Sequence, residues 1–191
     1  RAVAMLRAVT GNLDRPGGDL LPQPVPAADL QLKERLPDDR RAVTCDFPLF
    51  STFHRNWGLH AQSCVIDAIL DRRPYPLKAL VVQAGNPAVT MTEAGRVQQA
   101  LAEVEFLVVI DLFMTRTARF ADVVLPACSC FEKTQLNRAH LRNGLVLLQD
   151  EVIAPLGQSR PDWQIVFELG RRLGLAADFP WPDVEQAIDE Q

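Results

Sequence analysis

Blocks of apolar residues in the middle of the chain predict strands joined by helices. Residues 79–84 form a short, mostly apolar run, typical of a strand buried on both faces of a parallel sheet, and the apolar run at 106–110 predicts a second strand. Between them, apolar residues recur at helical spacing, at Val97, Ala100, Leu101 and Val104. A third, brief run at 123–125 ends at Pro126. Parallel strands need such crossover connections, which are almost always right-handed, so the pattern predicts an α/β fold.

Four further stretches have the residue spacing of helices. Residues 2–9 are good helix formers and are followed by Gly11, which favours a left-handed helix end. Residues 61–71 have apolar positions at helical spacing and stop before a proline. Another helix is expected to end at Gly174, and a last short helix covers 183–190. The helix before Gly174 carries an apolar stripe of Ile165, Val166, Leu169 and Leu173.

Side-chain caps are expected at two of the helix starts. Thr90 and Glu93 have the spacing of a capping box, and residues 159–162 resemble one. After the third strand the pattern is weaker. Residues 144–149 and 151–153 are compatible with short strands or with extended segments.

The length of 191 residues indicates a single α/β domain covering residues 1–191. Residues 21–60 have little periodicity and many prolines and charges in their first part, so we expect an extended, irregular connection. The aromatic residues between Phe47 and Trp57 are typical of a loop anchored to the core. The chain starts at Arg1 rather than Met, and we interpret it as an internal piece of a longer protein.

The charge and hydropathy of the chain argue against nucleic acid and membranes as binding partners. A net charge of −4 and a pI of about 5.4 provide no electrostatic attraction for nucleic acid or anionic lipid. No apolar run reaches the roughly 20 residues of a membrane-spanning helix. We therefore expect neither nucleic-acid binding nor direct membrane insertion. No targeting signal is visible, so the compartment, cytoplasmic or periplasmic, stays undetermined.

The cysteines and histidines predict no metal site. Cys128 and Cys130 form one C-x-C pair, and no second close pair completes a tetrahedral site. We expect this pair to be small buried thiols near a strand end; the other two cysteines are Cys45 and Cys64. The three histidines, His54, His60 and His140, show no metal-ligand spacing.

Small polar residues follow the first two predicted strands and form the candidate site. Gly85 and Asn86 come after the first strand, and Asp111 ends the second. Ligands of open parallel sheets bind beyond the carboxyl ends of the strands, where this glycine, amide and carboxylate would suit a phosphate, a base or hydroxyl groups. The alternative is that Gly85-Asn86-Pro87 forms only a turn, and that Asp111 caps the next helix or pairs with Arg116.

Other polar residues nearby have similar alternatives. Thr115 and Thr117 place hydroxyls at the start of a predicted short helix, where they would cap the helix or bind an anion. Glu132 and Lys133 form either part of a polar rim or a surface doublet. The G-x-G-x-x-G, phosphate-loop and G-x-S-x-G fingerprints are absent, so we predict no NAD-type site, no P-loop and no catalytic residue.

The candidate site lies within a series of segments that match a known family. In chain order these are TGNLDRPGG at 10–18, YPLK at 75–78, ALVVQAGNP at 79–87, FLVVID at 106–111, FMTRTA at 113–118, ADVVLP at 121–126, the pair at 132–133 and APLGQSRPDW at 154–163. Together they resemble the molybdopterin oxidoreductases of the dimethyl sulfoxide reductase superfamily. Lys133-Thr-Gln-Leu lacks a glycine that many members have there, and resembles the thiosulfate and polysulfide reductase branch more than the nitrate reductases.

The resemblance implies a fold and a set of cofactor contacts. Family members hold molybdenum or tungsten between two molybdopterin guanine dinucleotides. Their third domain, a three-layer α/β/α unit with a mostly parallel, Rossmann-like sheet, holds one dinucleotide at its strand ends. By position, the resemblance assigns cofactor contacts to Gly85, Asn86, Ile110, Asp111, Thr115 and Lys133. Asp111 would face guanine or ribose donors, and Thr115 would lie near the phosphates.

The resemblance also implies a function for the longer protein. The parent would be a molybdopterin-dependent oxidoreductase that catalyses two-electron redox of a small substrate, and this piece alone would be inactive. Its metal ligand and an iron–sulfur cluster would lie upstream. The expected partners are the dinucleotide, the remaining domains and electron-transfer subunits. The alternatives are a stand-alone nucleotide-binding or cofactor-handling module without catalysis, and a plain α/β interaction domain.

Overall fold

The computed structural model describes residues 2–19, 25–26, 62–137 and 145–190. The helices are α1 (Ala2–Val9), α3 (Gln62–Leu70), α4 (Pro87–Thr90), α5 (Ala94–Glu103), α6 (Asp162–Arg172) and α7 (Val184–Glu190), with 3₁₀ helices η2 (Ala118–Phe120), η3 (Cys130–Glu132) and η5 (Ala176–Asp178). The strands are β1 (Ala79–Gln83), β2 (Phe106–Asp111), β3 (Val123–Pro126), β4 (Gln135–Asn137) and β5 (Leu147–Gln149). Nearly all of the expected connection at 21–60, with Cys45 and the aromatic residues at 47–57, lies outside the described ranges, as do the three histidines.

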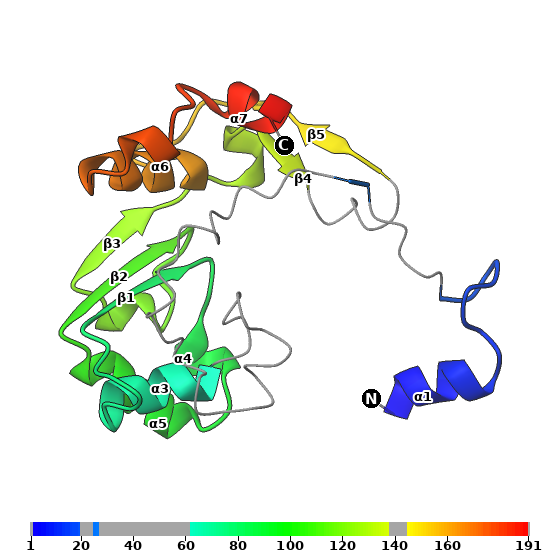
Figure 1. The fold of residues 1–191 in the computed structure, drawn as a ribbon, viewed down its shortest axis with the longest axis horizontal. Coiled ribbons are helices and arrows are strands. Elements are labelled where there is room, and N and C mark those ends of the chain that lie inside the picture. Colours follow the sequence, from blue (N-terminus) through cyan, green and yellow to red (C-terminus); the bar gives the residue numbers. More distant parts are fainter. Residues whose placement is uncertain (1, 20–24, 27–61, 138–144, 191) are drawn as a thin grey trace.

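The central sheet is parallel, as the alternation of strands and helices predicts. β1, β2 and β3 lie side by side in chain order (Figure 1). Val108 of β2 is in register with Val81 of β1 and with Val123 of β3. Helices α4 and α5 connect β1 to β2, and η2 lies between β2 and β3. The α/β prediction is therefore confirmed, together with its three strands.

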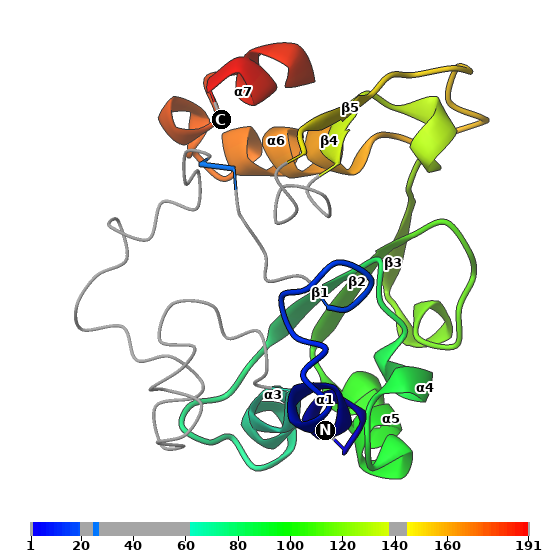
Figure 2. The same cartoon turned by 90° about the vertical axis from the view of Figure 1, so that its right-hand side faces the viewer.

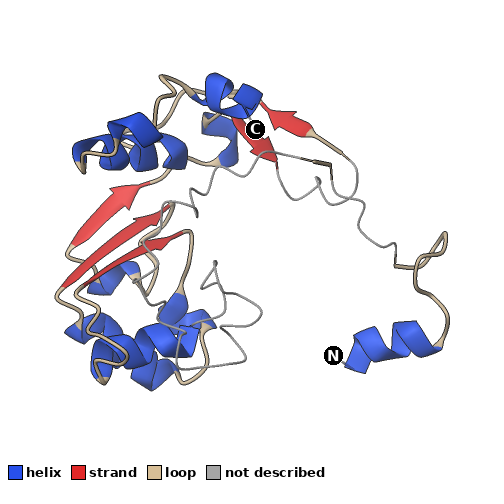
Figure 3. Cartoon of the chain, in the orientation of Figure 1, coloured by secondary structure: helices blue, strands red, loops and turns tan. Residues whose placement is uncertain are grey.

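The hydrophobic core lies between one face of this sheet and helices α3 and α5. Figure 3 shows helices, in blue, next to the three strands of this sheet, in red. Its buried side chains are Ile66, Ile69, Ala88, Val97, Ala100, Leu101, Val104, Leu107, Val109 and Ala118. The four apolar positions predicted to face inward at 97–104 are all at most 8% exposed. Figure 2 shows α3, α4 and α5 gathered on the same side of the strands. Burial of this one face accounts for the helical spacing seen in the sequence.

The opposite face of the sheet is partly open, which corrects one prediction. Val81 is 51% exposed and Val123 is 39% exposed. Residues 79–84 were expected to be buried on both faces, and this is wrong for the part of the chain that the structure describes. The reason is that β1 is an edge strand whose side chains alternate between the core and an uncovered face.

Both predicted capping boxes are wrong. Thr90 ends α4, and its hydroxyl donates to the carbonyl oxygen of Asn86 at 3.1 Å. Glu93 precedes α5 with a left-handed backbone (φ 56°) and makes no side-chain capping bond. The hydroxyl of Ser159 donates back to Leu156 O, and Pro161 is the residue at the N-cap of α6. In both places the hydroxyl bonds to a preceding carbonyl and does not accept from the next helix.

The C-terminal part packs around aromatic side chains. Phe167 of α6 contacts three rings, those of Trp163, Phe179 and Trp181, with centroid distances of 5.5–5.8 Å. The face of α6 that packs is therefore at Trp163, Phe167 and Gly170, whereas Leu169 and Leu173 of the apolar stripe are 46% and 67% exposed. Gly174 ends the helix with φ 85°, as predicted. The strand β4, absent from the sequence predictions, pairs antiparallel with β5.

Candidate functional site

A pocket of about 280 Å³ lies at the carboxyl ends of β1 and β2. Five of the six residues assigned to the cofactor line it, namely Gly85, Asn86, Ile110, Asp111 and Lys133. The other lining residues are Ala84, Leu112, Ala127, Cys128 and Asp162. Thr115, the sixth predicted residue, is not among them. The fold therefore brings together side chains from both strand ends and from the segment before β4.

The chain leaves β1 through a left-handed residue. Ala84 has φ 49°, and its N–H donates to Ile110 O at 2.9 Å, which ties the end of β1 to β2. A left-handed backbone costs a non-glycine residue roughly 1–2 kcal/mol. Gly85, in contrast, has room for a methyl group, because a Cβ built there would meet Val82 Cγ1 only at 3.5 Å. The surrounding protein therefore does not require glycine at position 85.

Asn86 is held by a residue from beyond the second strand. Its Oδ1 accepts from the hydroxyl of Thr117 at 2.8 Å and from the N–H of Thr117 at 3.2 Å. The side chain makes no capping bond to α4, although Asn86 occupies the N-cap position of that helix. The Nδ2 atom takes part in neither bond to Thr117. Asn86 is thus more than a turn residue, because its side chain links the segment after β1 to the start of η2.

Asp111 has a carboxylate with one backbone contact. Its Oδ1 accepts from the N–H of Phe113 at 3.2 Å, in the short-range pattern common for aspartate in turns. The predicted alternative of an ion pair with Arg116 is wrong, since Arg116 donates to Gln98 Oε1 at 3.3 Å. Oδ2 of Asp111 takes no part in the Phe113 bond. The carboxylate therefore keeps acceptor capacity at the pocket.

Thr115 has the capping role that the sequence left as an alternative. Its hydroxyl oxygen accepts from the N–H of Ala118, the first residue of η2, at 3.2 Å. The predicted short helix after Thr115 is this 3₁₀ turn. The residue in this segment that contacts a residue of the pocket is Thr117, which is fully buried and bonds to Asn86. No local sequence signal reveals this contact, because Asn86 and Thr117 are 31 residues apart.

Glu132 and Lys133 have different environments. Lys133 forms an ion pair with Asp162, and their side chains are 12% and 22% exposed. Glu132 is 6% exposed, so its description as part of a surface doublet is wrong. Its two oxygens accept from the N–H groups of Ser129 at 2.8 Å and Leu156 at 2.7 Å. Hydrogen bonds from the Ser129 side chain and backbone, with that of Leu156, lower the pKa of Glu132.

Replacing Glu132 by glutamine is expected to lower the melting temperature by roughly 5 °C at pH 7. A glutamine has only one oxygen, so its NH₂ group would face one of the two backbone donors. Because the folded-state pKa of Glu132 is lowered, its contribution is present above the unfolded pKa of about 4.3 and is lost as the pH falls through the folded value. Thermal unfolding followed by circular dichroism between pH 3 and 7 should show the difference shrinking below about pH 4. The exposed Glu151→Gln is the control, and an equal effect of both variants would contradict this role.

The expectation of buried thiols at the C-x-C pair is confirmed for Cys128 and is wrong for Cys130. Cys64 and Cys128 are buried, and burial raises the pKa of the Cys128 thiol. Cys130 is exposed, which corrects that prediction for this residue. Within the described ranges, no group of three or more His, Cys, Asp or Glu side chains is arranged to hold a metal ion. No helix in those ranges is long and apolar enough to cross a bilayer.

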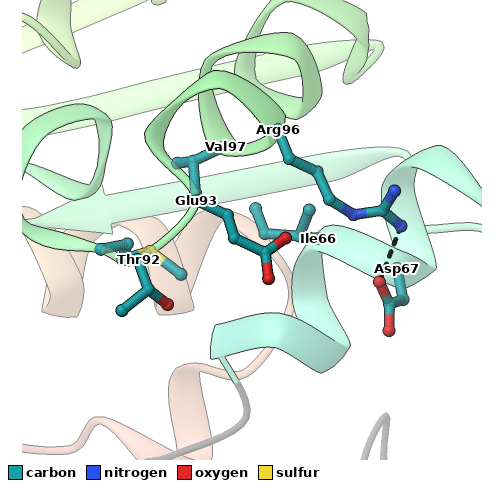
Figure 4. A pocket seen from close by; sticks show the side chains of 7 residues that line it. Ile66, Asp67, Thr92, Glu93, Arg96 and Val97 are labelled. Carbon is teal, nitrogen blue, oxygen red and sulfur yellow. Dashed lines mark hydrogen bonds and ion pairs between the residues drawn. The ribbon is translucent and has the colours of Figure 1, made fainter.

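A second pocket, of about 190 Å³, lies between α3 and the start of α5 (Figure 4). Arg96 donates there to Asp67 at 2.9 Å and to Asp71 at 2.6 Å. These hydrogen bonds raise the pKa of Arg96, Asp67 being the largest cause. The cation at this pocket is thus already paired with two carboxylates. The pocket at the strand ends, which has carboxylate and amide groups beside the sheet edge, is the stronger candidate for a ligand site.

Comparisons with known proteins give several relatives. The molybdopterin-containing subunit of thiosulfate reductase, PhsA, from Salmonella typhimurium is 29% identical over 97% of this chain and 26% of its own length. The probable oxidoreductase YjgC of Bacillus subtilis is 32% identical over 91% of this chain and 18% of its own. The solved structure of acetylene hydratase from Pelobacter acetylenicus matches 68% of this chain and 18% of that chain, with a TM-score of 0.64 and 27% identity.

The family model named molybdopterin oxidoreductase matches residues 1–172. The chain spans 26% and 18% of the length of the first two relatives. The names of the relatives differ in the reaction they describe, so the assignment to the thiosulfate and polysulfide reductase branch stays a prediction. The matched residues include both strand ends and the whole pocket. The chain belongs to the molybdopterin oxidoreductase family.

Proposed function

We propose that the pocket at the carboxyl ends of β1 and β2 binds the guanosine part of one molybdopterin guanine dinucleotide. The observation that carries this proposal is the meeting of Asn86 and Asp111 in one pocket, from two strand ends that parallel pairing places side by side. The parent enzyme is then a molybdopterin-dependent oxidoreductase acting on a small substrate. In this proposal the chain is part of a three-layer, Rossmann-like unit.

The donor set of the pocket fits this ligand. Guanine carries adjacent N1–H and N2–H₂ donors on one edge, and a carboxylate accepts from such a pair. Asp111 has the acceptor capacity for this contact, and Asn86 has an amide nitrogen that can donate to a carbonyl, ring nitrogen or phosphate oxygen. The surrounding protein leaves room for a side chain at position 85. A ligand that approaches the backbone closely there would explain why the residue is glycine.

The net negative charge around the pocket favours contacts with hydrogen-bond donors of the ligand over contacts with its phosphates. Lys133 is paired with Asp162, so the side-chain charges of Asp111, Asp162 and Lys133 sum to −1. A base edge or ribose hydroxyls suit this environment better than a phosphate does. Lys133 would reach the cofactor only by sharing its ammonium group between Asp162 and the ligand.

The residues of this chain would bind and orient the cofactor without taking part in the reaction. When bound, the cofactor supplies two-electron redox chemistry at molybdenum or tungsten. The metal ligand, an iron–sulfur cluster and electron-transfer subunits would belong to the rest of the parent and its assembly. This chain alone is therefore expected to have no reductase activity.

Isothermal titration of the chain with GDP and with ADP tests the proposed function. We expect weak, saturable binding of GDP and at least a tenfold weaker response to ADP. Adenine has neither the N1–H nor the N2–H₂ donor, so it leaves the Asp111 carboxylate without both of its proposed partners. Equal binding of both nucleotides, or no saturation by GDP, would count against a guanosine site.

A further inference from the structure

Thr117 is a buried threonine whose contacts lie at the edge of the proposed site. It is fully buried, and its hydroxyl donates to Asn86 Oδ1 at 2.8 Å while accepting from the N–H of Ala88 at 3.1 Å. Its own N–H donates to the same Oδ1 at 3.2 Å. One residue thus makes three hydrogen bonds to the segment that follows β1. A buried polar side chain with this many partners has a defined orientation.

These contacts determine which end of the Asn86 amide faces Thr117. A backbone N–H can only donate, so the atom that it meets must be an acceptor. The Asn86 amide must therefore turn its oxygen toward Thr117, and its NH₂ group points away from it. The hydrogen-bond partners thus distinguish the two possible orientations of the Asn86 amide. Because Asn86 lines the pocket, the NH₂ group is the end available to a ligand.

We propose that Thr117 is a positioning residue that sets the direction of the Asn86 amide, so that the pocket presents a donor from Asn86 beside the acceptor of Asp111. The identity of the ligand rests on the proposed function, whereas the direction of the amide does not. An acceptor and a donor on the ligand must then face Asn86 and Asp111 respectively. Thr117 contributes to recognition without touching the ligand.

The hydroxyl of Thr117 can be removed and restored with small changes. Thr117→Val keeps the shape of the side chain and the longer bond from the backbone N–H at 3.2 Å, but it removes the shorter hydroxyl bond at 2.8 Å, so one of the two bonds that hold the Asn86 oxygen is lost. Thr117→Ser keeps both bonds. We expect Thr117→Val to weaken GDP binding about fivefold to tenfold and Thr117→Ser to stay within about twofold of the wild type. Wild-type affinity in Thr117→Val, or equal losses in both variants, would overturn the proposal.

A spectroscopic test requires no ligand. In the unliganded chain the Nδ2 protons of Asn86 should show NMR contacts to protons of the pocket residues, because the NH₂ group points away from Thr117. We expect these contacts to weaken and the Nδ2 proton signals to move toward those of an unrestrained asparagine side chain in Thr117→Val, and we expect both to be retained in Thr117→Ser. Unchanged Asn86 signals in Thr117→Val would overturn the proposal. If wild-type GDP binding fails, the proposed function is wrong, and this measurement still decides the role of Thr117.

Asn86→Asp provides an independent variant if Thr117→Val does not fold. An aspartate keeps an oxygen for the two Thr117 donors and replaces the NH₂ group by a second acceptor. We expect a melting temperature within about 2 °C of the wild type and a loss of GDP affinity of at least tenfold. Wild-type affinity in Asn86→Asp would show that no donor is needed at this position, and would overturn the proposal.

Discussion

Replacing Asp111 by asparagine is expected to lower the affinity for GDP about 10-fold to 100-fold. The carboxylate has one backbone contact, from Phe113, and an asparagine oxygen can keep that bond. The substitution removes the charge and places an NH₂ group where the ligand's donors are proposed to lie. A hydrogen bond to a charged group contributes roughly 1.5–3 kcal/mol, which corresponds to this change in affinity. Isothermal titration of both proteins under identical salt conditions measures it.

Asp71→Asn is the matched control for this experiment. Asp71 contacts Arg96 and lies outside the pocket at the strand ends, so its replacement removes the same charge elsewhere. We expect wild-type GDP affinity in this control and similar melting temperatures in both variants. If Asp71→Asn weakens binding as much as Asp111→Asn does, the loss of affinity comes from the change in net charge. The proposed contact between Asp111 and the ligand would then be wrong.

Replacing Leu107 by alanine is expected to lower the free energy of unfolding by about 2–5 kcal/mol. Leu107 is 1% exposed and lies in the middle strand, where it packs against the helices on the core face of the sheet. Its N–H also donates to Asp122 at 2.7 Å, so the backbone around it has little freedom to close the cavity. Such a loss is a large share of the 5–15 kcal/mol typical of a domain. Urea unfolding followed by circular dichroism measures the change.

Leu173→Ala is the control for the cavity, because this leucine is 67% exposed. Its replacement should change the free energy of unfolding by less than about 0.5 kcal/mol. A loss in Leu107→Ala no greater than in Leu173→Ala would contradict the assignment of the core to this face of the sheet.

The central α/β unit could be predicted because local pattern and burial agree there. The apolar positions at 97–104 recur at helical spacing because one face of α5 packs on the sheet. The apolar run at 106–110 predicts a strand, and these residues do form the middle strand, which pairs with a strand on each side. At the edge strand β1 the same type of run overpredicts burial, because a sequence does not show whether neighbouring elements cover a face.

The errors lie where a side chain has a choice of hydrogen-bond partners. Thr90 and Ser159 were expected to accept from the next helix, and both donate to a preceding carbonyl instead. Glu132 looked like one half of a surface doublet, but its partners include Leu156, which is 24 residues away. A short-range sequence pattern indicates which hydrogen bonds are possible nearby. It does not show which partner the side chain takes in the folded protein.

Parallel pairing and the family resemblance together indicate five of the residues that line the pocket of the candidate site, and their contact with the cofactor stays a prediction. Thr117 was noted only as a hydroxyl at a helix start. Its role depends on a contact across 31 residues, between segments that meet only when β1 and β2 pair. The role of Thr117 therefore required the three-dimensional structure.

Amide chemical-shift mapping of the ¹⁵N-labelled chain with GDP tests whether the pocket at the strand ends binds guanosine. We expect the largest shifts at Gly85, Asn86 and Asp111, and we expect these shifts to saturate together with a single dissociation constant. Residues of the second pocket, such as Arg96, should shift little, which provides an internal control. The claim would be contradicted if GDP shifted amides around Arg96 more than those at the strand ends, or if it shifted no amide at the strand ends.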